Sequence, residues 1–100
     1  MRRESVAAAI RLIQPNGSGG FTLHTDAGPE HFATLVEAIE IGRLNLTQLI
    51  LERMRQDQVE NPLIDFMVKE KKVTDGMGQE IFIEAEIRMR AMGRPSVRDI

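Results

Sequence analysis

The chain contains no cysteine, tryptophan or tyrosine. Without cysteine it has no disulfide framework, no thiolate metal site and no thiol nucleophile, which fits a reducing compartment such as the cytoplasm. Without tyrosine and tryptophan it lacks the polar aromatic side chains that often line ligand pockets. These absences remove several ways to build an active site, so we expect no enzymatic activity and no cofactor.

Long apolar runs are missing as well. No stretch approaches the roughly 18 to 20 apolar residues that span a bilayer. The short apolar segment near the start is bracketed by Glu4 and Arg11 and is too brief for a secretory signal. We therefore expect a cytoplasmic protein that does not contact a membrane.

The sequence has enough apolar material for one core. Of its 100 residues, 42% are hydrophobic and 28% are charged, which are values typical of a folded domain. A chain of this length is too short for two ordinary domains. The expected organisation is a single globular domain over residues 1–93 and a flexible basic tail over 94–100.

Motifs for catalysis and phosphate binding are incomplete. No lysine follows the glycines at 17–20 as a P-loop requires, and Thr22 stands where a dinucleotide-binding loop needs glycine. No serine lies in a nucleophile elbow. His24 and His31 could join Asp26 in a metal site, but surface positions explain these histidines more simply. We expect no catalytic, cofactor-binding or metal-binding residues.

Apolar spacing and end signals predict four helices. Pro29 suits the first position of a helix, Gly42 is placed to end that helix in a left-handed conformation, and Asn45 can cap the next one. The alanine-rich N-terminal segment also alternates like an edge strand, but we favour a helix there. The expected helices cover residues 4–14, 29–41, 45–58 and 62–72.

Two segments alternate apolar and polar residues as strands do. They are residues 21–25 and 81–89, and a turn at 75–78 precedes the second. Residues 81–92 are rich in helix-forming types, so a helix remains the alternative there. The expected fold class is α+β: three to four helices packed on a short antiparallel sheet made from residues 21–25 and a hairpin near Gly76. An all-α fold is the alternative.

The charges are unevenly distributed along the chain, whose net charge is −2. Residues 12–42 contain four acidic residues and no lysine or arginine, whereas residues 88–100 contain four arginines and one aspartate. Such polarity suits a charged partner or self-association. Either the acidic segment or the basic one could be the working surface.

The first functional hypothesis is a non-enzymatic protein-binding module. It would be a small regulator or inhibitor that occupies a site on a larger, nucleic-acid-handling machine. Acidic residues away from the apolar stripe of the expected helix 29–41 could meet a basic groove on that partner, and methionines near a turn and near the tail could form adaptable contacts. The candidate partner-binding residues are Glu30, Glu37, Glu40, Met77 and Met92.

In its general profile the chain is similar to phage and mobile-element inhibitors of host defence, such as anti-CRISPR proteins. The resemblance lies in small size, an acidic balance and the lack of cysteine. It involves no motif and assigns a role to no residue. It implies an inhibitor with a protein partner.

The alternative is a nucleic-acid-binding transcriptional regulator that uses the helix 45–58 and the basic C-terminal region. Helix–glycine–helix around Gly42 resembles a helix-turn-helix, although Gln48 falls where that motif buries an apolar residue. The candidate nucleic-acid-binding residues are Arg53, Arg55, Arg88, Arg90, Arg94 and Arg98. A homodimer, formed by pairing of the strand 81–89 with its copy, is a third hypothesis.

Overall fold

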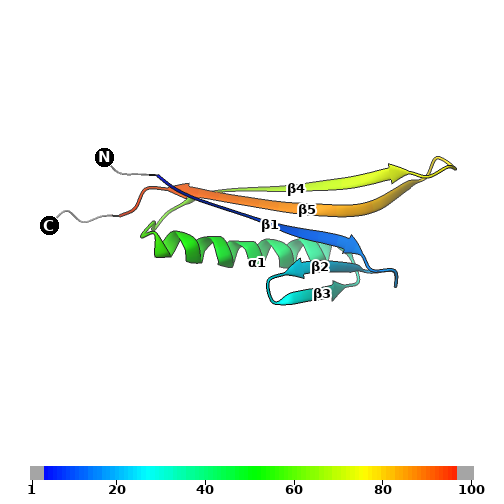
Figure 1. Ribbon diagram of the computed structural model, residues 1–100, viewed down its shortest axis with the longest axis horizontal. Helices are drawn as coiled ribbons and strands as arrows, with labels where there is room; N and C mark the ends of the chain where they lie inside the picture. The colour runs from blue at the N-terminus through cyan, green and yellow to red at the C-terminus, as the bar shows by residue number, and fades with distance from the viewer. Residues whose placement is uncertain (1–3, 97–100) are drawn as a thin grey trace.

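The computed structural model describes residues 4–96 of the chain. Its elements, in chain order, are β1 (Ser5–Pro15), β2 (Phe21–Thr25), β3 (Gly28–Phe32), α1 (Leu35–Gln56), β4 (Leu63–Thr74) and β5 (Glu80–Gly93). The strands form one antiparallel sheet in the order β3-β2-β1-β5-β4. The sheet is one layer and α1 is the other, as Figure 1 shows.

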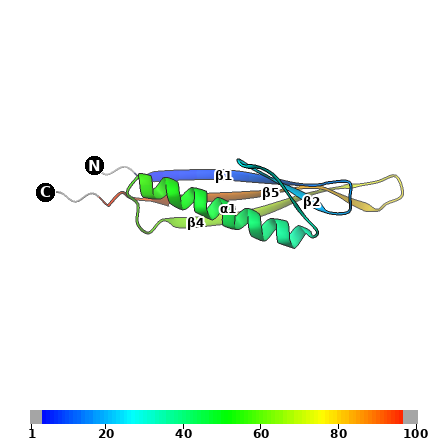
Figure 2. The same ribbon diagram turned by 90° about the horizontal axis from the view of Figure 1, so that it is seen from below.

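The helix α1 covers one face of the sheet and leaves the other face open (Figures 1 and 2). Its backbone packs on β1, β5, β2 and β3. It reaches β4 only through a side chain, because the guanidinium of Arg43 lies 5.1 Å from the ring centre of Phe66. From Ala38 onward, every fourth residue of the helix faces the sheet and is buried. These residues are Ala38, Gly42, Leu46, Ile50 and Met54. The core therefore lies in a single layer between α1 and the centre of the sheet.

Every second residue of β1 and β5 faces α1. Ile13 and Ile87 are fully buried there, and small side chains at Ala85 and Ala91 let the helix approach closely. Alternation then turns the intervening residues to the open face. The same alternation extends to β4, where Phe66 pairs with Met89 on the helix side.

The predicted architecture of three to four helices on a short sheet is wrong, and so is the all-α alternative. Helix and antiparallel sheet both occur, as the α+β class requires, but there is one helix and five strands. Local helix propensity misled the prediction, because pairing with distant strands decides the state of these segments.

Residues 4–14, expected to be helical, form the central strand β1. Val6 pairs with Met92 and Ile13 pairs with Ala85 of β5, while Leu12 pairs with His24 of β2. The edge-strand alternative is correct for residues 5–11, which pair with β5 only, and wrong for Leu12 and Ile13, which pair with both β5 and β2. Pairing with β5 and burial under α1 outweigh the helix preference of the three consecutive alanines.

The two helices expected at 29–41 and 45–58 are one helix. Pro29 lies in β3, and the helix starts after Thr34, whose Oγ1 accepts a hydrogen bond from the backbone N–H of Glu37 at 3.2 Å. Gly42 does not end the helix. It lies where the helix touches the sheet, and a Cβ there would meet Cδ1 of Ile87 at 2.5 Å. Close packing, not a turn, explains this glycine.

Residues 62–72, expected to form a helix, belong mostly to β4. Their partner β5 is the predicted strand at 81–89, which the structure confirms and extends to Glu80–Gly93. The predicted strand 21–25 and the turn at 75–78 are confirmed too. The helix end expected at Lys69 to Lys72 is wrong because alternation against β5 continues through these lysines, with one irregularity between Lys71 and Lys72.

No helix in the described part of the chain is long and apolar enough to cross a membrane. After β5 the described chain continues through Arg94 to Ser96. Residues 97–100, part of the tail expected from the sequence, lie outside the described residues.

Candidate interaction surface

The open face of the sheet carries exposed apolar side chains across three neighbouring strands. Val6 and Ile10 of β1 are 57% and 50% exposed, and Leu63 and Met67 of β4 are 74% and 60% exposed. Strand register aligns them, because Val6 and Leu63 both pair with Met92. We call this surface, formed by β1, β5 and β4, the open face. Apolar side chains grouped in this way are typical of protein-binding sites.

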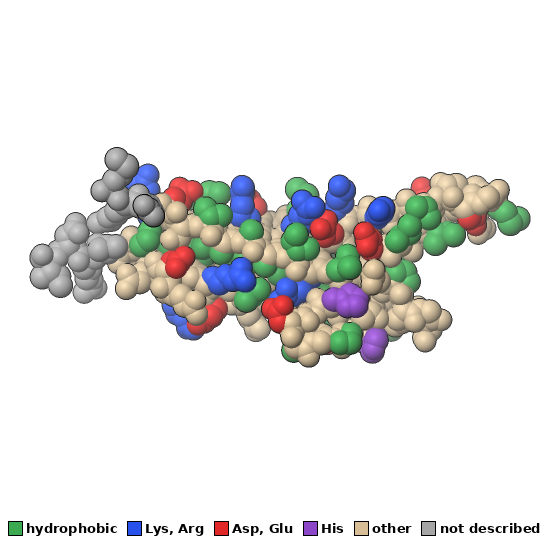
Figure 3. Space-filling model, viewed as in Figure 1, with side chains coloured by type: hydrophobic (Ala, Val, Ile, Leu, Met, Phe, Trp, Pro, Cys, Tyr) green, Lys and Arg blue, Asp and Glu red, His purple; other side chains and the backbone are tan. Residues whose placement is uncertain are grey.

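Two arginines of β5 lie between these apolar residues. Arg88 is bonded to Glu86, with Nη2 2.9 Å from the carboxylate, and Arg90 lies 3.4 Å from Asp65. In the space-filling view, hydrophobic and charged side chains alternate along the upper side, away from α1 (Figure 3). The open face thus mixes apolar groups with charges of both signs.

A shallow hollow of about 600 Å³ lies on this face. Ile10 and Met67 form its sides, and Arg88 and Arg90 lie between them. A partner's apolar side chain could fill the hollow while a polar group of the partner reaches the guanidinium groups.

The hairpin of β4 and β5 extends beyond the rest of the sheet as an arm (Figure 1). The pairing of β1 with β5 starts at Ala85, so residues 71–84 have no third strand beside them. Val73 and Ile81 pair within the arm and are 42% and 48% exposed, and Met77 at its tip is 90% exposed. The arm presents apolar side chains far from the core.

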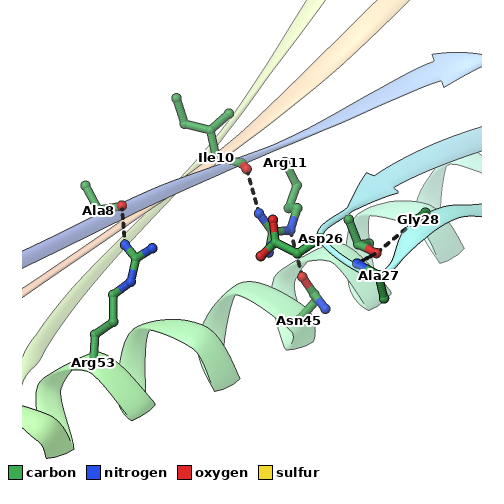
Figure 4. Close-up of polar contacts among 9 residues, drawn as sticks. Ala8, Ile10, Arg11, Asp26, Ala27, Gly28, Asn45 and Arg53 are labelled. Atoms are coloured by element: carbon green, nitrogen blue, oxygen red, sulfur yellow. Dashed lines mark hydrogen bonds and ion pairs between the residues drawn. The ribbon is translucent and has the colours of Figure 1, made fainter.

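The opposite side of the sheet contains a buried arginine that fixes α1 against the strands. Arg11 is 8% exposed. Its Nε donates to Asn45 Oδ1 at 2.7 Å, its Nη2 contacts Asp26 Oδ2 at 3.0 Å and its Nη1 donates to the Ile10 carbonyl at 3.1 Å (Figure 4). One side chain thereby joins β1, the β2–β3 turn and the helix. All its polar neighbours belong to the chain, so we assign Arg11 a structural role.

The acidic residues predicted to bind a partner lie on the helix side of the molecule. Glu37 and Glu40 are exposed on the first turns of α1. Glu30 is exposed on β3, opposite the buried Leu23, and therefore on the sheet face that α1 covers. The three residues share a side of the protein, but nothing in the described chain forms a cleft among them.

The two predicted methionine contacts lie in different places. Met77 occupies the tip of the arm, whereas Met92 is half-buried between Val6 and Leu63 on the open face. The structure therefore does not join them with the acidic residues into one surface. Met92 alone belongs to the open face.

The basic residues proposed for nucleic-acid binding are divided between the two sides of the sheet. Arg88 and Arg90 lie on the open face, whereas Arg53 and Arg55 lie on α1. Arg53 donates to the Ala8 carbonyl of β1 at 3.2 Å, and Arg55 is paired with Glu52. These four arginines therefore do not share one surface: Arg88 and Arg90 lie near Lys69 and Lys71 on the open face, and the two arginines of α1 lie on the other side.

Arg94 is exposed after the end of β5, while Arg98 lies outside the described residues. The expected recognition helix 45–58 is chiefly the C-terminal half of α1. Its inward side chains Leu46, Ile50 and Met54 are fully buried against the sheet. It is a core element and not a free helix.

Both histidines bond to neighbouring side chains on the sheet. His31 Nδ1 lies 3.0 Å from Thr22 Oγ1, and His24 Nε2 lies 3.1 Å from Gln14 Oε1. Among residues 4–96, no group of three or more histidine, aspartate or glutamate side chains is arranged to hold a metal ion. His24, His31 and Asp26 do not form such a group.

Sequence reasoning missed the apolar part of the open face. The alternation of Val6, Ile10 and Leu12 indicates a strand with these side chains on one face. The alanine-rich composition of the segment favoured a helix instead. Leu63 and Met67 were hidden for the same reason, because β4 was expected to be helical.

The chain matches no protein-family model, no curated protein and no solved structure, so its function is argued from its own geometry.

Proposed function

We propose that the protein is a non-enzymatic protein-binding module and that the open face is its binding surface. The supporting observation is the one-sided sheet: α1 covers one face, while the other exposes Val6, Ile10, Leu63 and Met67. An apolar group of this kind, bordered by charges, is typical of a surface that a protein partner covers.

The chemistry of the open face defines the partner. Apolar side chains of the partner would enter the hollow between Ile10 and Met67. Acidic groups of the partner would approach Arg88 and Arg90, whose side chains are 54% and 56% exposed. The partner is therefore a protein surface with apolar residues next to carboxylates.

The proposal keeps the biological setting expected from the sequence. The protein would act in the cytoplasm as a small regulator or inhibitor of a larger machine, in the manner of phage and mobile-element anti-defence proteins. The absence of cysteine and the small size support this setting. A protein partner is favoured over nucleic acid because the open face combines its basic groups with exposed apolar side chains and with Asp65 and Glu86, whose carboxylates pair with Arg90 and Arg88.

The test compares two variants in nuclease-treated lysate of the cells that express the protein. The double variant Val6→Glu/Ile10→Glu places charges on the open face, and Val36→Glu changes a 65% exposed residue on α1. We expect a stoichiometric protein to bind the wild type and Val36→Glu. The purified partner should bind the double variant at least about tenfold more weakly, since an interface anchor contributes more than about 1 kcal/mol.

Three outcomes would contradict the proposal. Equal binding by the double variant would remove the open face as the surface. Loss of binding only in Glu37→Lys/Glu40→Lys would move the site to the acidic side of α1. Recovery of nucleic acid alone from a parallel lysate without nuclease, lost on nuclease treatment or on added salt, would favour a nucleic-acid-binding regulator.

A further inference from the structure

The strand β4 forms an outer edge of the sheet along all twelve of its residues. An edge strand has one row of backbone N–H and C=O groups without strand partners, which another chain can use for pairing. Within residues 4–96, no hydrogen bond from another segment reaches this edge. The helix α1 contacts the inner face of β4 through Arg43, which lies over the Phe66 ring, and leaves the backbone edge of β4 free.

The other open edges of the sheet are short, or their backbone carbonyl groups accept hydrogen bonds from side chains. The opposite edge is β3, which has five residues and includes Pro29, a residue that cannot donate to a ladder. Along β1, where β2 does not reach, Arg53 bonds the Ala8 carbonyl and Arg11 bonds the Ile10 carbonyl. The edge of β4 is therefore the long one. The bulge between Lys71 and Lys72 and the lysines around it disfavour pairing along the second half of β4. Residues 63–68 form a regular ladder whose one charged residue is Asp65.

We propose that β4 pairs antiparallel with β4 of a second copy of this chain, about a two-fold axis at Met67. The two five-stranded sheets then become one. In this register Asp65 faces Lys69 of the second copy, and Phe66 faces Val68. Both pairs occur twice because of the symmetry. Opposite charges and apolar side chains directly across a ladder stabilise the pairing.

Neighbouring registers are less complementary. Moving the axis to Phe66 leaves Asp65 without a cation opposite it. Moving it to Val68 sets Asp65 against Lys71, but it places Met67 against Lys69 and Phe66 against Glu70 beside the axis. With the axis at Met67, the mismatch of Ile64 with Glu70 lies three residues from the axis. An axis at Lys69 or at Glu70 places like charges opposite each other, which destabilises a ladder. The residues next to the axis thus favour the register about Met67.

Single cysteines test this register, because the chain has no cysteine of its own. Met67→Cys would place two thiols directly opposite each other, with Cα atoms about 4.5 to 5.5 Å apart, which suits a disulfide. Val36→Cys, on the exposed side of α1, is the control for random collision. We expect Met67→Cys to form a disulfide dimer at least about a hundredfold faster at micromolar protein, since paired thiols have an effective concentration of order mM.

Two further variants distinguish this register from other arrangements. Neither Asp65→Cys nor Lys69→Cys should form a disulfide dimer with itself, because in this register each residue lies about 13 Å from the same residue of the second copy. A mixture of the two proteins should form the mixed disulfide. Efficient cross-linking of either variant with itself, or slow cross-linking of Met67→Cys, would overturn the proposal.

A measurement without cysteine uses two variants that flank the same arginine. Met67 and Ile10 both pair with Arg88, so Met67→Glu and Ile10→Glu have similar effects within one chain. Only Met67→Glu places two carboxylates together at the two-fold axis. We expect the dimer dissociation constant of Met67→Glu to rise at least about tenfold, because like charges then lie directly across the ladder. The dissociation constant of Ile10→Glu should stay near the wild-type value. Sedimentation equilibrium measures both constants. A wild-type protein that sediments as a monomer at all concentrations would contradict the pairing.

The pairing and the proposed function can fail separately. The double variant Val6→Glu/Ile10→Glu changes the open face on β1, far from the edge of β4. If it loses the partner but still dimerises, both proposals hold. If the wild type dimerises and binds no partner, only the proposed function fails.

Discussion

Gly42 lies in the middle of α1, where glycine usually weakens a helix relative to alanine. Here the missing side chain lets the helix rest on the sheet. A Cβ would meet Ile87 Cδ1 at 2.5 Å and Leu23 Cδ1 at 3.1 Å, and both of those side chains are fully buried. The distance between helix and sheet therefore depends on this residue.

We expect Gly42→Ala to lower the free energy of unfolding. Alanine would gain about 1 kcal/mol of helix propensity, but overpacking a filled core costs about 1–3 kcal/mol. The net loss should be about 1 kcal/mol, measured by urea denaturation. Gln48→Ala, on the exposed side of the same helix, is the control and should change stability by less than about 0.5 kcal/mol. Stabilisation by Gly42→Ala would show that the contact relaxes freely.

The Arg11 cluster gives a second prediction at the residue scale. Asn45→Ala and Arg11→Lys should each lower the free energy of unfolding by about 1–3 kcal/mol, because each leaves a half-buried polar group without its partner. Asp26→Ala should cost less than about 0.5 kcal/mol, since Asp26 is 79% exposed and water screens its ion pair. Thermal or urea denaturation checks this order, and a larger loss for Asp26→Ala would contradict it.

At the scale of elements, the arm and the core layer are held by different forces. Residues 71–84 pair only with each other beyond the end of β1, whereas the centre of β5 is bonded on both sides and buried under α1. The turn of the arm depends on Asp75, whose Oδ1 accepts hydrogen bonds from the backbone N–H groups of Met77 and Gln79 at 2.8 and 2.9 Å. Local bonds therefore maintain the tip of the arm, whereas at its base Phe82 packs edge-on against Phe21 of β2, with ring centres 5.5 Å apart.

We expect Asp75→Ala to loosen the arm without affecting the core. Amide hydrogen exchange near residues 73–81 should become faster, because local opening there exposes little buried apolar surface. The melting temperature should stay near that of the wild type. Thr34→Ala is the reciprocal control: it removes the cap of α1, costs about 1 kcal/mol and should leave exchange in the arm unchanged. Faster exchange in β1 of Asp75→Ala would show that arm and core unfold together.

At the scale of the whole molecule, the protein is elongated. It measures 67 × 25 × 16 Å with a radius of gyration of 17.2 Å, against about 13 Å for a compact domain of 100 residues. A single helix on a five-stranded sheet leaves one broad face and one long edge uncovered. The shape therefore supports both proposals, a protein partner on the open face and a second copy along β4.

Features that depend on neighbouring residues could be predicted without the structure. The Asp-Gly turn of the arm, the alternation of β5 and the short strand β2 were predicted correctly, because turn residues and period-two alternation are local signals. Met77 was correctly placed in a turn. The absence of cysteine and of known motifs also limits the chemistry open to the protein.

The state of residues 4–14, 29–32 and 62–72 depends on contacts between segments that are far apart in the chain. Their alanines, lysines and glutamates favour helix by a few tenths of a kcal/mol per residue. Partners far along the chain, such as Met92 for both Val6 and Leu63, override that preference by hydrogen bonding and packing. The open face is made of these same segments, so it became visible only when β1, β5 and β4 were placed side by side.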